Sequence, residues 1–168
     1  GMVVVEATVG GTALNSQETL IAETEYGGKG GFLVQTPAEP VVTDIAISTQ
    51  EVTAGQDRDW TVDVALSNEG ESDVLLDFSG EKTYLTFSTG EDFKLIHPER
   101  FVSGDSILRG NSQEVLRFAV DTTGSVSGQC VVNISAEGTE INSSRLISGI
   151  SAEGAVTGSI DIQESGVL

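Results

Sequence analysis

Residues 60–68 read WTVDVALSN, and this stretch carries the clearest structural pattern in the chain. Trp60, Val62, Val64 and Leu66 alternate with small or polar residues. An alternation with a period of two is typical of an antiparallel strand that buries one face, so we expect the tryptophan to face a core. The following residues, Asn-Glu-Gly-Glu, have turn chemistry and predict the end of the strand.

Further short apolar segments lie on both sides of this strand, separated by turn residues. We predict strands at 3–9, 32–35, 45–47, 74–78, 84–88, 93–96, 115–120, 130–135 and 160–162, a short continuation at 51–53, and a loop over 101–110. No segment sustains a period of 3.6, so we expect very little helix. Short strands with frequent turns are typical of two packed sheets. The prediction is an all-β fold, an immunoglobulin-like β-sandwich of about seven to nine strands.

Residues 3–35 resemble residues 130–163 when the two are aligned at a shift of 127, and of 128 after one inserted residue. Nine of about 33 aligned pairs are identical, and several fall in a shared G-T-x-[LI]-N-S motif, at Gly11 and at Gly138. We interpret this as an internal repeat of roughly 127 residues. Residues 3–36 are then a two-stranded C-terminal fragment of a preceding repeat with the start of a linker, and 37–164 form one whole repeat. We expect Trp60 and Cys130 to share its core.

The segment from Thr36 to Pro40 reads TPAEP and is predicted to be the linker. Two prolines in four residues remove backbone donors and stiffen the chain. The fragment before it is too short to fold alone, so we expect it to be disordered, to lie against the intact domain, or to self-associate with a second molecule through residues 3–36. We favour packing or pairing, because open strand edges recruit other strands.

The chain is strongly acidic, with a formal net charge of −18. Nucleic acids and anionic membranes need a basic face, so neither is expected as a partner. No stretch approaches the roughly 20 apolar residues that cross a bilayer. We therefore expect a soluble segment with no membrane insertion, whose signal and anchor lie outside it. The charge itself is interpreted as a solvating surface, with divalent cation binding as the alternative.

Residue types that carry catalysis are sparse here. The single histidine, His97, precedes a proline in a predicted loop, and the single cysteine, Cys130, falls on the inward face of a strand. We expect a surface histidine and a buried, inert thiol. Residues 27–31 read GGKGG but lack the spacing of a phosphate-binding loop, so a mobile hairpin tip is expected. We predict no enzyme activity, no catalytic residue and no cofactor.

Calcium is the metal that this composition suits best, because its ligands are oxygens. Asp57 and Asp59 flank the start of the tryptophan strand, and Asp105 and Asp121 lie in other predicted loops. None of them belongs to a calcium-binding loop with the spacing D-x-[DN]-x-[DN]-G. We therefore predict no specific metal site.

Several motifs together resemble a known family. They are the linker TPAEP, WTVDVALSNEG at 60–70, ILRGNSQEVLRFAVD at 107–121, SGQCVVNI at 127–134 and GTEINS at 138–143. The chain resembles the immunoglobulin-like, CARDB-like repeats that are strung along bacterial and archaeal surface proteins. The resemblance covers 3–36 and 37–164, and it implies turns and core strands rather than catalytic residues.

These observations predict a non-catalytic structural or spacer module of a tandem-repeat protein, located extracellularly at the cell surface and contacting adjacent repeats of the same chain. The alternative is an adhesion module that binds carbohydrate or protein through loops at one end of the sandwich. Such a module would expose aromatic side chains, and the candidates are Phe93, Phe101, Tyr84 and, in the fragment, Tyr26.

Overall fold

A computed structural model of the chain describes the backbone of residues 2–5, 9–12, 19–22, 30–152 and 156–166, and the side chains from residue 34 onward within these ranges. The chain divides into two compact units, residues 1–35 and residues 36–168. The origin of the first unit in a preceding repeat remains a prediction.

In its described residues, the first unit contains two antiparallel ladders of four short strand segments, where the sequence predicted a two-stranded fragment. Strand β1 (Met2–Val5) pairs with β4 (Gly30–Leu33), and β2 (Val9–Thr12) pairs with β3 (Thr19–Ala22). The β2–β3 ladder lies in sequence between β1 and β4, so the four segments have the connectivity of a hairpin. Its strands are rich in β-branched and small residues, as expected for a pleated ribbon.

The second unit is an immunoglobulin-like β-sandwich, so the predicted all-β fold class is confirmed. Its strands are β5 (Pro40–Ile47), β6 (Glu51–Thr53), β7 (Trp60–Asn68), β8 (Val74–Leu76), β9 (Tyr84–Phe87), β10 (Lys94–Ile96), β11 (Ile107–Leu108), β12 (Ser112–Thr122), β13 (Gly128–Glu140), β14 (Leu146–Ser151) and β15 (Gly158–Gln163).

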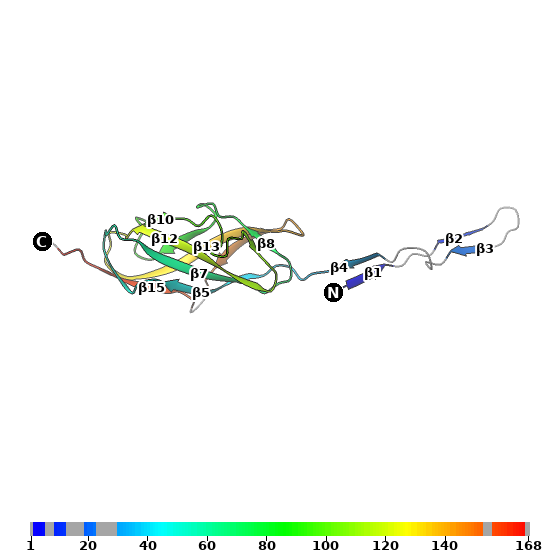
Figure 1. Cartoon of the computed structure of the whole chain (residues 1–168), viewed down its shortest axis with the longest axis horizontal. Coiled ribbons are helices and arrows are strands. Elements are labelled where there is room, and N and C mark those ends of the chain that lie inside the picture. The colour runs from blue at the N-terminus through cyan, green and yellow to red at the C-terminus, as the bar shows by residue number, and fades with distance from the viewer. Residues whose placement is uncertain (1, 6–8, 13–18, 23–29, 153–155, 167–168) are drawn as a thin grey trace. The chain divides into compact units, whose positions relative to one another are not determined.

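Two sheets make up this sandwich (Figure 1). The first has the order β10-β12-β7-β5 and is antiparallel throughout. The second has the order β11-β8-β13-β15-β6, and β9 and β14 also pair with the long strand β13. One ladder of the second sheet, β15 with β6, is parallel.

The core lies between the sheets and is built from alternating residues of β7, β12, β13 and β15. Strand β7 alternates regularly between buried and half-buried positions, from Trp60, which is 4% exposed, to Asn68. Cys130 is fully buried in the same cluster as Trp60, which confirms that the two share one core. Trp60 Nε1 donates to Thr123 Oγ1 at 3.1 Å, so the buried indole keeps a hydrogen-bond partner.

Some local predictions were less accurate. The expected count of about seven to nine strands compares with eleven strand segments among the described residues of the sandwich, because several segments have only two or three residues. The predicted loop over 101–110 contains β11, which pairs with β8. Within it Phe101 is 1% exposed and packs edge-on against Phe78 at 5.4 Å, so it is a core residue.

The chain enters and leaves the sandwich at opposite ends (Figure 1). Pro40, at the start of β5, pairs with Asn68 at the end of β7, and Glu140 ends β13 at this same entry end. Gln163, at the end of β15, accepts a hydrogen bond from the backbone of Ala54 at the exit end. Among the described residues, no helix has the length and apolar character needed to span a bilayer.

Candidate functional site

The linker segment 36–39 is hydrogen-bonded to the entry end of the sandwich along its length. The first contact is reciprocal: Thr36 N donates to Glu71 Oε2 at 2.9 Å, and Glu71 N donates to Thr36 Oγ1 at 3.1 Å. Ser72 N also donates to the carbonyl oxygen of Thr36 at 3.2 Å. The start of the linker is therefore paired with the turn that follows β7.

Asn68 connects the end of the linker to the same turn. Its Oδ1 accepts from Glu39 N at 3.0 Å and from Gly70 N at 3.1 Å, while its Nδ2 donates to the carbonyl oxygen of Ser72 at 2.8 Å. The residue is 1% exposed. A buried amide is costly unless its donors and acceptor are satisfied, and here the linker supplies part of that satisfaction.

Glu140 and Arg145 hold the middle of the linker from the hairpin between β13 and β14. Glu140 Oε1 accepts from Ala38 N at 2.7 Å, and Arg145 Nη2 donates to the carbonyl oxygen of Ala38 at 3.0 Å. Glu140 Oε2 also accepts from Ser143 Oγ and from Arg145 Nε, the latter at 3.2 Å. Both backbone groups of one linker residue are thus bound by one ion pair.

The environment of Glu140 favours its charged form although the residue is only 4% exposed. The hydrogen bond from Ser143, then that from the backbone of Ala38, and then Arg145 lower the pKa of Glu140 from 4.5 to about 2, against the opposing effect of burial. Hydrogen bonds to a carboxylate stabilise the charged form and are stronger than those between neutral groups. The carboxylate is therefore ionised at neutral pH while it binds the linker.

Gly70 allows the linker to approach the turn closely. A Cβ atom at this position would lie 1.9 Å from the carbonyl oxygen of Pro37 and 2.8 Å from the Cα atom of Ala38. Backbone atoms cannot yield as the end of a flexible side chain can, so a larger residue would displace the linker. We call Asn68, Gly70, Glu71, Glu140 and Arg145 the linker clamp. Chemically, this set fixes the position and direction of a polypeptide segment.

The two residues considered for catalysis are packed into the fold. His97 lies edge-on to Phe118 with ring centroids 6.0 Å apart, and the space beside its ring is left by Gly80. It is half-buried rather than a surface residue, which corrects the prediction. The reason is that His97 directly follows β10, which pairs with β12, and its ring lies against Phe118 of β12 and beside Gly80. Cys130 is fully buried, as predicted.

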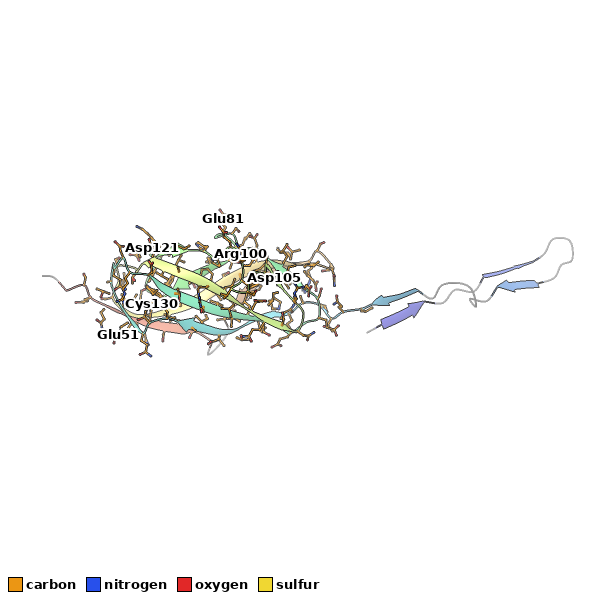
Figure 2. All side chains as sticks on the ribbon, viewed as in Figure 1. Glu51, Glu81, Arg100, Asp105, Asp121 and Cys130 are labelled. Carbon is orange, nitrogen blue, oxygen red and sulfur yellow. The ribbon has the colours of Figure 1, made fainter. Side chains whose placement is uncertain are left out.

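Two of the four aspartates considered for calcium, Asp57 and Asp105, accept hydrogen bonds from nearby residues. Asp57 accepts from Thr122 Oγ1 at 3.0 Å, and Asp105 accepts from the backbone of Ser106 and Ile107, which lowers its pKa together with Arg109. Figure 2 shows Asp105 and Asp121 at separate places on the sandwich. In the described part of the chain, no group of three or more His, Cys, Asp or Glu residues could hold a metal ion.

Two of the aromatic residues proposed for ligand binding, Phe93 and Tyr84, line a cleft between the two sheets. The edge cleft has a volume of about 340 Å³ and lies between β9 of one sheet and β10 of the other. Phe93 stacks on Phe87 with centroids 3.8 Å apart. Besides Phe93 and Phe87, the cleft is lined by residues that include Tyr84, Leu85, Leu95 and His97. Phe101 does not contribute, because it is buried in the core.

Two other predictions from the sequence concern the first unit. Tyr26 and residues 27–29 of the glycine-rich segment lie outside the described residues. Gly30 and Gly31, the last glycines of that segment, belong to β4 and pair with Val5 and Val4.

No family model matches the chain, and no curated protein sequence matches it. Among solved structures, it is similar to the secreted serine protease VesC from Vibrio cholerae, with 10% identity and a TM-score of 0.35, over 72% of this chain and 23% of that one. It is also similar to domains 4 and 5 of the S-layer protein SbsC, with 15% identity and a TM-score of 0.24, over 96% of this chain and 67% of that one. At these TM-scores neither likeness bears on what the chain does.

The linker clamp was not predicted from the sequence, although the signal for it was present. Asn68 and Gly70 lie in the motif NEG at 68–70 and Glu140 in GTEINS at 138–143, while Glu71 and Arg145 follow these motifs closely. The sequence alone suggests two turns there and a separate linker, TPAEP. The structure brings these three motifs together at one end of the sandwich. Glu140 and Arg145 bind Ala38, which lies about 100 residues earlier in the chain, and nothing in the local sequence around this charged pair indicates that partner.

Proposed function

We propose that this chain is a non-catalytic spacer module of an extracellular, tandem-repeat surface protein, of the CARDB-like type. The observation that carries the proposal is the linker clamp. A linker that only connects domains needs no contact with either of them and remains flexible. Here the linker is bound at Thr36, Ala38 and Glu39, with a buried carboxylate and a buried amide committed to it.

The positions of the two chain ends within the sandwich support a role in spacing. The linker enters beside Asn68 and Glu140, and β15 leaves at the opposite end (Figure 1). Repeats joined in this way follow one another end to end. Strand β7 alone has nine residues, which corresponds to about 30 Å of length per repeat. Tension between the two ends would load the strands lengthwise, so that many hydrogen bonds of each ladder share it.

The test is the distribution of distances between successive repeats. We would join two copies of residues 36–163, continue the second to residue 168, and place one spin label in each copy through Glu81→Cys, an exposed position. The buried Cys130 should remain unlabelled. Double electron–electron resonance should give one narrow distance distribution, because the clamp of the second copy fixes the linker.

The decisive variant is Gly70→Ala in the second copy, which should broaden that distribution by displacing the linker. Glu99→Gln, an exposed substitution away from the linker, serves as the control and should leave the distribution unchanged. A broad distribution in the unsubstituted chain, or no effect of Gly70→Ala, would overturn the spacer function.

The extracellular location is a separate part of the proposal and has its own test. Antibodies raised against residues 36–168 should label intact cells of the source organism. Labelling that appears only after the cells are permeabilised would contradict an extracellular location, whatever the linker does.

A second candidate function is adhesion, and the edge cleft favours it. Its volume is within the range of small ligand sites, and its walls carry stacked aromatic rings beside the polar atoms of Tyr84 and His97. Among the described residues, Nδ1 of His97 is buried without a hydrogen-bond partner. Oligosaccharide binding on a glycan array should fall by about tenfold or more in Phe93→Ala, with Glu99→Gln as the control. Absence of binding by the unsubstituted chain would contradict an oligosaccharide ligand for this cleft.

A further inference from the structure

The pairing of β1 with β4 and of β2 with β3 largely follows that of the last three strands of the sandwich. At the shifts found in the sequence, six of the eight residue pairs in the first unit coincide with pairs in β13, β14 and β15. Val3 pairs with Phe32 as Cys130 pairs with Ile160. The departure is at Val9 and Gly10, where the corresponding part of β13 contains a register shift between Ala136 and Gly138.

The coincidence of register extends beyond what two similar sequences require. A hairpin can pair in several registers, and a slip by one residue exchanges the two faces. The first unit pairs Gly11 with Leu20 and Thr12 with Thr19, as β13 and β14 pair Gly138 with Ile147 and Thr139 with Leu146. The ladder of β1 with β4 is therefore set as in the complete sandwich at all four pairs, and the ladder of β2 with β3 at two of its four pairs.

Glycines at two equivalent positions indicate what lies against these strands. In the complete sandwich, a Cβ at Gly158 would come within 2.8 Å of Ile45 Cγ2 of β5 in the facing sheet. A Cβ at Gly138 would lie 2.8 Å from the carbonyl oxygen of Leu75 of β8. Their counterparts in the first unit are also glycines, Gly30 and Gly11. Gly30 and Gly11 thus occupy the two positions that approach β5 and β8 closely in the sandwich.

The apolar pattern agrees with this assignment. Cys130, Val132 and Ile160 are at most 2% exposed in the sandwich, and the corresponding residues of the first unit are Val3, Val5 and Phe32. Val131, between the two buried positions of β13, is 39% exposed. The first unit therefore keeps apolar residues at the positions that β13 and β15 bury against the facing sheet.

We propose that β1 to β4 correspond to the last three strands of another sandwich of this type, and that their partner is a set of strands equivalent to β5–β12 in a preceding copy of the repeat. This inference rests on the tandem-repeat function proposed above. The partner presents an Ile-bearing strand over Gly30 and a second strand beside Gly11. The contact is an interface between one sheet and another, with the chemistry of a domain core.

The experiment supplies that partner to the full chain. Residues 36–127 are fused ahead of residues 1–168, so that 1–35 follow them as 128–163 do in the complete sandwich. The two-copy chain described under the proposed function serves as the reference, because it joins two complete sandwiches through the same linker. Backbone amides of 2–33 should become protected from hydrogen exchange by about a hundredfold or more relative to the unfused chain. Unprotected amides in the fused chain, with both sandwiches folded in the reference, would overturn the proposal.

Two adjacent substitutions make the test specific. In the fused chain, Gly30→Ala should lower the melting temperature of the first sandwich, because it corresponds to the close contact at Gly158. Gly31→Ala corresponds to the exposed Ser159 and should leave that temperature unchanged. Equal effects of the two substitutions would contradict the proposed contact with a β5-like strand.

Register is measured independently in the unfused chain. Val4→Cys should form a disulfide with Gly31→Cys faster than with Leu33→Cys, because Val4 pairs with Gly31. Equal rates would overturn the assignment whether or not the fused chains fold. A dimer of the unfused chain that persists after fusion would show a second copy as the occupant instead. If the amides stay unprotected in the fused chain while the two-copy chain gives a narrow distance distribution, this proposal fails and the spacer function stands.

Discussion

Trp60 is the residue on which the core depends most directly. It is 4% exposed, donates to Thr123 Oγ1 at 3.1 Å and lies edge-on to Phe87 at 6.5 Å. Trp60→Ala should destabilise the sandwich by about 3–5 kcal/mol, because a large cavity would remain between the sheets. Trp60→Phe keeps most of the packing but loses the donor, so its cost should be smaller, about 1–2 kcal/mol. Urea unfolding measures both, and equal costs would contradict this packing.

Glu140 should make stability depend on acidity in a defined range. Its pKa is about 2 in the folded chain and 4.5 ordinarily, so its contribution is complete above pH 4.5 and is lost as the pH falls towards 2. Glu140→Gln should remove that dependence. The difference in free energy of unfolding between the original chain and Glu140→Gln should therefore shrink between pH 4.5 and pH 2. A difference that stays constant over this range would show that the carboxylate is not held as described.

At the scale of elements, the predictable strands are those that bury one face, because burial of one face makes apolar and polar residues alternate in the sequence. Strand β7 and the core-forming parts of β12 and β13 alternate because one side faces the other sheet, and this alternation is visible in the sequence. Strand β11 has two residues, which is too short for any period to appear. Strand β14 is largely exposed, since four of its six residues face solvent, so it lacks a clear alternation of its own.

The candidate site was less predictable than the fold for a related reason. Hydrogen bonds between the linker and Glu140 join positions 102 residues apart, and no local pattern encodes such a pairing. The repeat, which stays a prediction, rests on another source of information, because comparison of the chain with itself does not depend on local patterns. It predicted that 3–35 corresponds to 130–163, and the backbone register agrees with that correspondence at six of eight pairs.

Strand β13 approaches β8 so closely at Gly138 that a side chain there would collide with β8. A Cβ at Gly138 would lie 2.8 Å from Leu75 O and 2.8 Å from Val74 Cγ1 of β8. Gly138→Ala should cost about 1–3 kcal/mol, because β8 must move away from β13. Gln129→Ala, on an exposed part of the same strand, is the control and should change the free energy of unfolding by less than about 0.5 kcal/mol. Similar costs at both positions would contradict the close approach.

At the scale of the whole molecule, the formal net charge of −18 should make stability depend on salt but not on calcium in particular. Carboxylates such as Glu51, Glu81 and Asp121 are spread over the sandwich (Figure 2), so screening reduces their mutual repulsion. Sodium chloride and calcium chloride at equal ionic strength should raise the melting temperature by similar amounts. A specific site would add about 2.7 kcal/mol at a hundredfold excess over its dissociation constant. A large shift with calcium alone would therefore reveal one.

The linker belongs energetically to the sandwich that follows it, and shortening the chain tests this directly. A chain of residues 36–168 keeps Thr36, Ala38 and Glu39, whereas a chain of residues 41–168 removes them. In the shorter chain, Glu140 and Asn68 lose backbone partners that are hydrogen-bonded to them at 2.7 and 3.0 Å. Buried polar groups without partners are destabilising, so the shorter chain should be less stable by about 2–4 kcal/mol.

The measurement is the free energy of unfolding of both chains in urea, with Glu140→Ala introduced into each. The substitution should be costly in the 36–168 chain and much less so in the 41–168 chain, because its partner Ala38 is already absent there. Additive effects of truncation and substitution would mean that the carboxylate and the linker do not act together. In that case the clamp would not fix the direction of the linker, and the spacer function would lose its physical basis.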